Sequence, residues 1–360
     1  MRSKRKRTSK TPPKNLESTQ QQTFKFRKLE LERFFYWINE RHSIHLKKQA
    51  GVNRKGMGWP WTKDKILQQY KFTNPFRQND RVTKDWMNRY ASLLAIEKTG
   101  KQVPDDLILF HLCMFRLFNY PPTYDALNFA MFKSKGLGWN KEKAVAILKE
   151  RRDGVNSPDS QIFTGAYMIT PGSGSDKIDT YCEVLDQLWD GRTENQKKKR
   201  SSVPRRVRWT RAIKARRSMR RATALLCKLD CVGPFIAYEI VCDLRHTRIL
   251  SDALDIDTWA NAGPGAKRGV HRLLTGDKEH PKGVIDYNAA MIELLRIARD
   301  DKRLSKDVLS CEWPFNAREI EHSLCEYDKM SRVRMGQGKP RSTYKRPDPQ
   351  MQLPWGDDDE

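Results

Sequence analysis

The stretch LLCKLDCVGPFIAYEIVCDLRHTRILSDALDIDT, residues 225–258, decides the fold. It predicts a helix, a tight turn over residues 230–233, a second helix that begins at Pro234, and then a loop. Proline suits the first turn of a helix because its missing N–H would have no partner there. Exposed backbone amides at a helix N-terminus can bind a phosphate group. The residues of this turn and of the start of the second helix that we expect to contact DNA are Val232, Gly233 and Phe235.

The charge of the chain also indicates a polyanionic partner. Its 69 Lys and Arg residues against 44 Asp and Glu give a net charge of +25. Between Arg192 and Arg221 there are fourteen basic residues and one acidic residue, and this block leads directly into the first hairpin helix. Such clusters bind nucleic acid because they release counterions from the phosphate backbone. A solvated linker is the alternative. The residues of the block chosen as DNA contacts are Arg205, Arg206, Arg208 and Arg211.

Apolar residues recur mostly with helical periodicity along the rest of the chain, so the predicted fold class is mainly α. Helices are expected near residues 83–98, 105–118, 123–132, 141–150, 177–189, 286–299 and 317–330. Residues 1–22 are predicted to be a basic disordered tail and residues 336–360 a disordered C-terminal tail. Residues 23–335 are then one helical catalytic domain, with the hairpin motif in residues 216–258.

Several classes of protein are excluded by absent patterns. No apolar run approaches the ~18 residues of a membrane helix, and the basic N-terminus lacks the apolar core of a signal peptide. The seven cysteines include no CxxC pair, so we expect reduced thiols, no iron–sulfur cluster, and an intracellular monomer located with DNA. The pattern GxxxxGK[ST] is absent, so no P-loop nucleotide site is expected and no cofactor is predicted.

The hairpin pattern resembles the helix-hairpin-helix DNA glycosylase superfamily. In that superfamily an aspartate roughly twenty residues after the hairpin lies in the base pocket, and Asp257 holds the matching position. The bifunctional members place a nucleophilic lysine two residues after the second hairpin glycine, where this chain has Phe235. Lyase chemistry through that lysine is therefore not expected. The first hairpin glycine is replaced by Cys231.

Four further motifs carry a second resemblance. They are PWTKDKILQQYKFTNPFRQNDRVT (residues 60–83), IFTGAY (162–167), DIDTWANAGPGAKRG (255–269) and EHSLCEYDKMSR (321–332). Together they resemble the helical domain associated with 5-hydroxymethyluracil DNA kinases, also named the alpha-glutamyl/putrescinyl thymine pyrophosphorylase family. The resemblance spans residues 34–344 and agrees with a glycosylase-like helical fold. It implies DNA with modified thymine as partner, and a separate 5-hydroxymethyluracil DNA kinase that acts earlier.

The resemblance implies that an amine replaces the phosphate or pyrophosphate on a phosphorylated 5-hydroxymethyl group. The amine comes from a co-substrate such as glycine, glutamate or putrescine. Asp257 would stabilise positive charge or deprotonate the amine, and Lys267 and Arg268 would bind the leaving group. The glycines that would let DNA approach the backbone are Gly263, Gly265 and Gly269.

Polar residues that helix packing does not require are assigned to the base pocket. Arg77 and Arg81 are expected to hold an amino-acid carboxylate, and Asn74 and Asn119 to contact a pyrimidine edge. Each residue also has an ordinary explanation as a helix cap, a turn residue or a surface ion pair. The whole set is Glu40, Arg41, His42, Asn74, Arg77, Asp80, Arg81, Arg116, Asn119 and Tyr167.

Two other functions remain open from the sequence. A monofunctional DNA glycosylase acting on a modified pyrimidine needs only Asp257 and a flipped base. A non-catalytic DNA-binding protein needs only the positive charge. The leading hypothesis is an enzyme of DNA base hypermodification.

Overall fold

The computed structural model describes residues 22–52, 59–98, 100, 102–132, 138–154, 159–164, 176–191, 203–300 and 302–344. Within these ranges the regular structure is helical, and Tyr70 and Thr343 form an isolated β-bridge. This confirms the predicted mainly α fold.

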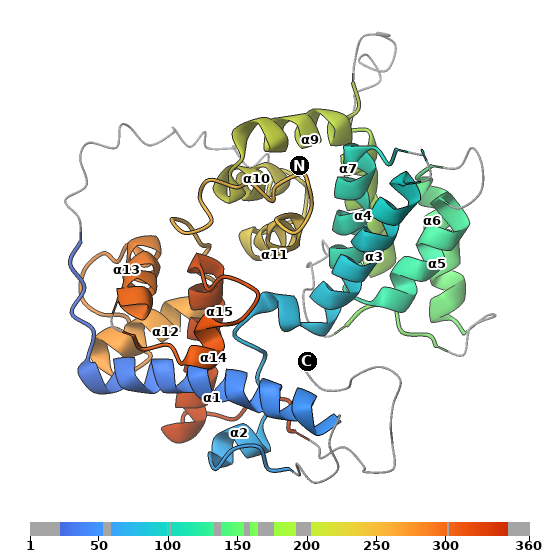
Figure 1. Ribbon diagram of the computed structural model, residues 1–360. Helices are drawn as coiled ribbons and strands as arrows, with labels where there is room; N and C mark the ends of the chain where they lie inside the picture. The colour runs from blue at the N-terminus through green and yellow to red at the C-terminus, as the bar shows by residue number, and fades with distance from the viewer. Residues whose placement is uncertain are drawn as a thin grey trace, which may run out of the picture.

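The helices form two groups, which Figure 1 shows on either side of the molecule. The terminal lobe combines both ends of the chain: α1 (Lys28–Val52), α12 (Pro264–Thr275), α13 (Tyr287–Asp300), α14 (Lys306–Leu309) and α15 (Ala317–Arg334). The central lobe contains α3 (Arg81–Glu97), α4 (Asp105–Phe118), α5 (Pro121–Phe132), α6 (Lys141–Arg152), α7 (Lys177–Trp189), α9 (Arg205–Arg216), α10 (Met219–Leu226) and α11 (Pro234–Leu244). The chain passes between the lobes through α2 (Lys65–Gln69) and η1 (Arg77–Asn79). The predicted helices are present.

Helix α4 is the core of the central lobe. It is apolar on nearly every side, and all of its residues from Ile108 to Phe118 are buried. A helix that is hydrophobic all round must be enclosed by other helices, and α4 packs against α5, α7, α9 and α11. Its buried polar residues His111 and Arg116 therefore need partners inside the protein, and Arg116 has them in the site described below.

The close packing of α12 on α15 holds the terminal lobe together and explains two glycines. A Cβ on Gly265 would overlap the Sγ of Cys325, and a Cβ on Gly269 would overlap the backbone carbonyl of Leu324. Both positions therefore require glycine for helix packing. At each glycine, the side where a Cβ would lie is packed against α15. The structure therefore does not support the expectation that a DNA backbone approaches the chain at these two positions.

The predicted hairpin is present as α10, a turn and α11. Pro234 is the first residue of α11, and Gly233 is its N-cap. Cys231 has a φ of 61°, a left-handed conformation that favours glycine. The side chain of Asp255 accepts hydrogen bonds from the Ser218 hydroxyl and from the first backbone amides of α10. The loop after α11 is thus fixed to the start of the hairpin.

The C-terminal segment departs from the prediction over its first residues. Gln337 accepts a hydrogen bond from Arg272 at 2.9 Å, and Tyr344 pairs with the backbone of Gln69 at 2.8 Å. Residues 336–344 therefore pack on the domain because they provide partners for α2 and α12. Residues 1–21 and 345–360 lie outside the described ranges. No helix in the described ranges has the length and apolarity needed to cross a membrane.

Candidate active site

A buried cluster of charges lies where α11 meets η1, α3 and α4. The carboxylate of Asp243, fully buried on α11, contacts the guanidinium groups of Arg116 and Arg77 and accepts a hydrogen bond from Thr83. Burial raises the pKa of Asp243, but the two arginines outweigh it and bring the pKa to about 2. Asp243 is therefore ionised, and it holds two buried cations in place.

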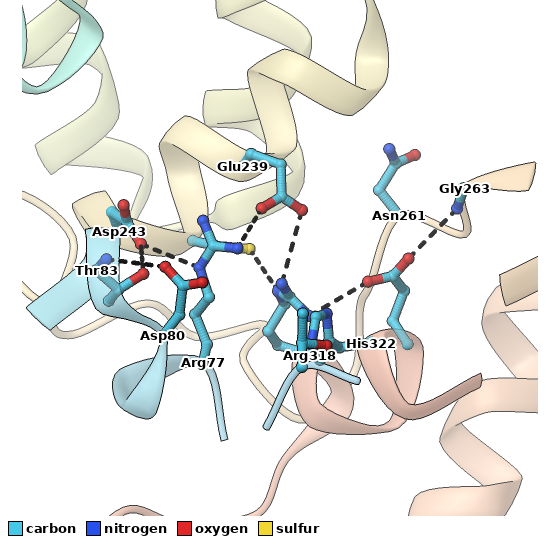
Figure 2. Close-up of polar contacts among 12 residues, drawn as sticks. Arg77, Asp80, Thr83, Glu239, Asp243, Asn261, Gly263, Arg318 and His322 are labelled. Atoms are coloured by element: carbon cyan, nitrogen blue, oxygen red, sulfur yellow. Dashed lines mark hydrogen bonds and ion pairs between the residues drawn. The ribbon is translucent and has the colours of Figure 1, made fainter. Parts of the chain in front are cut away.

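The cluster continues across the lobe boundary to α15. Glu239, one turn before Asp243, forms ion pairs with Arg77 at 2.6 Å and Arg318 at 3.6 Å, and Figure 2 shows it between the two arginines. Arg318 also contacts Glu321 at 3.4 Å. These side chains are all at least nine-tenths buried. Alternating charges thus join η1, α11 and α15 in one chain of contacts.

Glu321 forms the end of this chain that reaches the hairpin. The Gly263 amide, at the N-cap of α12, lies 3.5 Å from the Glu321 carboxylate, and the exposed ring of Phe235 lies beside Gly263. Burial raises the pKa of Glu321 to about 7, against the lowering effect of Arg318. A carboxyl group with this pKa can accept or release a proton near neutral pH. Glu321 is the titrating group of the candidate active site.

The predicted base-pocket residues lie in several separate parts of the chain. Arg77, Asp80, Arg116 and Asn119 belong to the buried cluster, with Arg116 donating to Asn119 at 2.8 Å. Arg81 is exposed on α3, and Glu40, Arg41 and His42 lie on α1. Tyr167 lies outside the described residues.

Three members of this set form contacts inside the protein. Arg77 is buried against two carboxylates, so it is not available to hold an amino-acid carboxylate. The side-chain oxygen of Asn74 accepts from the Phe76 amide, and Asn119 bonds to Arg116 and Thr164. These contacts are internal to the protein, and the Nδ2 atom of Asn74 is buried without a partner among the described residues, so contact of either asparagine with a pyrimidine edge stays a prediction.

The predicted catalytic residues lie on the terminal lobe and in the loop before it. Asp257 forms an ion pair of 2.7 Å with Arg299 of α13, and both side chains are about half-exposed. Arg268 is paired with Asp328 at 2.9 Å. Lys267 is exposed, with its amine 5.2 Å from the ring centre of Tyr287. Their catalytic roles stay predictions.

The basic helix α9 presents only part of its charge to solvent. Arg206 donates to Asp106 and to the Trp189 carbonyl, and its guanidinium lies 3.8 Å from the Trp189 ring centre. It therefore anchors α9 to the domain, which does not support its assignment as a DNA contact. Arg205 is partly buried over Trp209, whereas Arg208 and Arg211 are exposed.

Three buried members of the cluster were not found from the sequence, Glu239, Asp243 and Arg318, and Glu321 was quoted only within the motif EHSLCEYDKMSR, without a role. The sequence of α11 contained one indication of the buried cluster. Glu239 and Asp243 are the acidic residues of the otherwise apolar helix PFIAYEIVCDL, and they are four residues apart on one face. Acidic groups on a helix this apolar require buried cations as partners. Within the described ranges, no three His, Cys, Asp or Glu side chains are grouped to hold a metal ion.

Comparisons with known proteins identify the family of this chain. A sequence profile described as "5-hmdU DNA kinase, helical domain" matches residues 29–340, and the chain belongs to that family. A curated relative, the 5-hmdU DNA kinase of Bacillus phage SP10, is 26% identical over 249 residues. The match covers 65% of this chain and 35% of the relative, so the chain spans about a third of that protein's length. No solved structure matches.

Proposed function

We propose that this protein modifies thymine-derived bases in DNA, by transferring an amine onto phosphorylated 5-hydroxymethyluracil with release of phosphate or pyrophosphate. The family and the phage relative named 5-hmdU DNA kinase support the choice of base. The hairpin, with exposed Arg208 and Arg211 nearby in the sequence, supports binding to DNA. The single observation that carries the reaction type is the buried Glu321 beside Gly263 and Phe235.

The reaction needs a proton acceptor and a site from which water is excluded. The amine nitrogen attacks the 5-methylene carbon, the carbon–oxygen bond breaks, and the phosphate leaves with the bonding electrons. The attacking nitrogen must then lose a proton. In this proposal Glu321 takes that proton, because burial keeps its pKa near that of a useful base. Lys267, exposed one turn into α12, then binds the departing phosphate.

The hypothesis is tested by the nucleosides that the protein produces. Duplex DNA containing 5-phosphomethyluracil or its pyrophosphorylated form is incubated with the full chain and a panel of amines that includes glycine, glutamate and putrescine. The DNA is then digested and the nucleosides are identified by mass spectrometry. A parallel sample contains 5-hydroxymethyluracil DNA and ATP.

Each result separates the alternatives. A nucleoside bearing the added amine, formed only with the phosphorylated base, supports the proposal. A phosphorylated nucleoside in the ATP sample would instead make this chain a kinase, as the name of the relative suggests. Abasic sites would make it a glycosylase that uses Asp257. Unchanged DNA in both samples would contradict any catalytic role.

A further inference from the structure

A pocket separate from the charge cluster lies between α1, the η1–α3 segment and residues 307–313. Its volume is ≈ 630 Å³, which is within the range of small-molecule sites. Histidines from α1 line one side, and Trp313 lines another. Exposed Lys84 supplies a cation there, and exposed Asp307 and Glu312 supply two carboxylates.

Gln78 is the unusual member of this pocket. Its side chain is 2% exposed, and among the described residues neither its amide oxygen nor its amide nitrogen has a hydrogen-bond partner. The Nδ1 atom of His42, also in the lining, is buried without a partner in the same part of the chain. Unsatisfied buried polar atoms destabilise a protein, so their presence in a pocket indicates partners supplied by a ligand.

The buried side of the pocket is neutral. Burial lowers the pKa of His42, and it lowers that of His45 to about 3, with further lowering by nearby Arg41 and Lys84. Both rings are therefore uncharged imidazoles at neutral pH, and the backbone of Asp307 already hydrogen-bonds to the His42 ring, which leaves its Nδ1 atom without a partner among the described residues. Together with the Gln78 amide they offer hydrogen bonds of both kinds without charge. Such a surface suits an uncharged ligand that carries a donor next to an acceptor.

We propose that this pocket binds the imide edge of a uracil-type pyrimidine, with Gln78 hydrogen-bonded to it and Trp313 against the ring. A primary amide can donate to a ring carbonyl and accept from the adjacent N–H in one plane, as amide side chains do with base edges in DNA. The choice of a pyrimidine rests on the proposed function, and because the pocket lining contains neither Glu321 nor Lys267, the base held here is a different one from the base that reacts. The base can come from DNA, after extrusion from the helix, or from a free nucleoside.

Photocrosslinking tests the proposal with both sources of the base. One sample contains duplex DNA with a single 5-iodo-2′-deoxyuridine, and the other contains the free nucleoside. After irradiation, crosslinked peptides of the full chain are mapped by mass spectrometry. We expect crosslinks within residues 78–88 and 307–313. Crosslinks from duplex DNA identify an extruded base as the ligand, and crosslinks from the nucleoside alone identify a free pyrimidine.

The variant Gln78→Met keeps the side-chain length but removes both hydrogen-bonding atoms. It should lower the crosslink yield by about tenfold or more, while the thermal midpoint stays equal or rises, because no internal hydrogen bond is lost. The matched control is Gln68→Met, which removes a hydrogen bond of 2.6 Å to the Thr62 carbonyl in a different part of the fold. It should lower the thermal midpoint and leave crosslinking unchanged.

Different results would contradict the pocket assignment and the proposed function. Crosslinks confined to other peptides, or an equal yield in Gln78→Met and the parent, would overturn the pocket assignment. Crosslinks that Gln78→Met removes, in a protein that forms no amine-bearing nucleoside, would keep the pocket and reject the transfer reaction.

Discussion

Arg77 and Gln78 are neighbours in one short helical turn, yet their side chains lie in opposite kinds of environment. Both are 2% exposed. The Arg77 guanidinium contacts two carboxylates within the charge cluster, whereas the Gln78 amide has no partner in the described protein. A buried ionic group that is matched by its neighbours holds a fold together, because removing one partner leaves an uncompensated charge. A buried polar group without a partner indicates a contact that the protein chain does not supply.

The largest effect on stability is expected from Asp243→Asn. The substitution leaves Arg77 and Arg116 without their shared anion, so the free energy of unfolding should fall by about 3–5 kcal/mol. Urea unfolding followed by circular dichroism measures the change. The control is Asp252→Asn, because Asp252 is exposed in its ion pair with Arg217 and should contribute less than about 1 kcal/mol. Equal losses in the two variants would mean that the cluster does not stabilise the fold.

Substitutions of the neighbours Arg77 and Gln78 compare directly the stability contributed by a paired and by an unpaired buried side chain. Arg77→Met should destabilise the protein by about 3 kcal/mol, toward the lower end for a broken buried pair because Asp243 keeps Arg116 and Glu239 keeps Arg318. Gln78→Met should change stability by less than about 1 kcal/mol, in the stabilising direction. Differential scanning calorimetry of both variants measures the two effects. A loss of stability in Gln78→Met similar to that in Arg77→Met would show that Gln78 also has an internal partner.

The third prediction concerns the pH dependence of the cluster. The pKa of Glu321 is about 7 in the folded protein, above its ordinary value of 4.5, so the folded state holds the proton more tightly than the unfolded state. This contribution to stability is present below pH 4.5 and is lost as the pH rises through 7. Between pH 5 and 7 the parent should lose about 2 kcal/mol relative to Glu321→Gln. Thermal midpoints of both proteins that change in parallel with pH would contradict the raised pKa.

The smallest effect on stability is expected on the exposed face of α9. The double substitution Arg208→Ser, Arg211→Ser should change the free energy of unfolding by less than about 0.5 kcal/mol. It should reduce the slope of log K for DNA against log salt by up to about 2, since each phosphate contact contributes ~0.9. Fluorescence anisotropy at several salt concentrations measures the slope. An unchanged slope would identify this face of α9 as a solvated surface.

The sequence was sufficient for features determined by nearby residues. The hairpin follows from Gly233 and Pro234, and helices α3 to α7, α13 and α15 follow from apolar periodicity, so these were predicted close to their observed positions. Contacts between distant segments were not predictable in this way. Gly265 and Gly269 resemble a flexible glycine loop in the sequence, but they face α15 because the two helices pack closely.

The candidate site shows the same limit. Arg77 and Arg116 were chosen from the sequence as ligand-binding cations, but their anions lie more than a hundred residues away on α11. Gln78 was not chosen, since an amide without a partner is recognised only when its surroundings are known. Asp257 was chosen by its distance from the hairpin, and the structure adds its ion pair with Arg299.

The central claim is that Glu321 accepts a proton during amine transfer to a phosphorylated base. The direct measurement is the rate at which the amine-bearing nucleoside forms under single-turnover conditions, for the parent and Glu321→Gln, across pH 5.5–8.5. The parent rate should rise with pH through about 7, as Glu321 ionises. Glu321→Gln should be slower by about 10²-fold or more and lack that rise, with DNA affinity unchanged. Equal rates and equal pH profiles in the two proteins would contradict the claim.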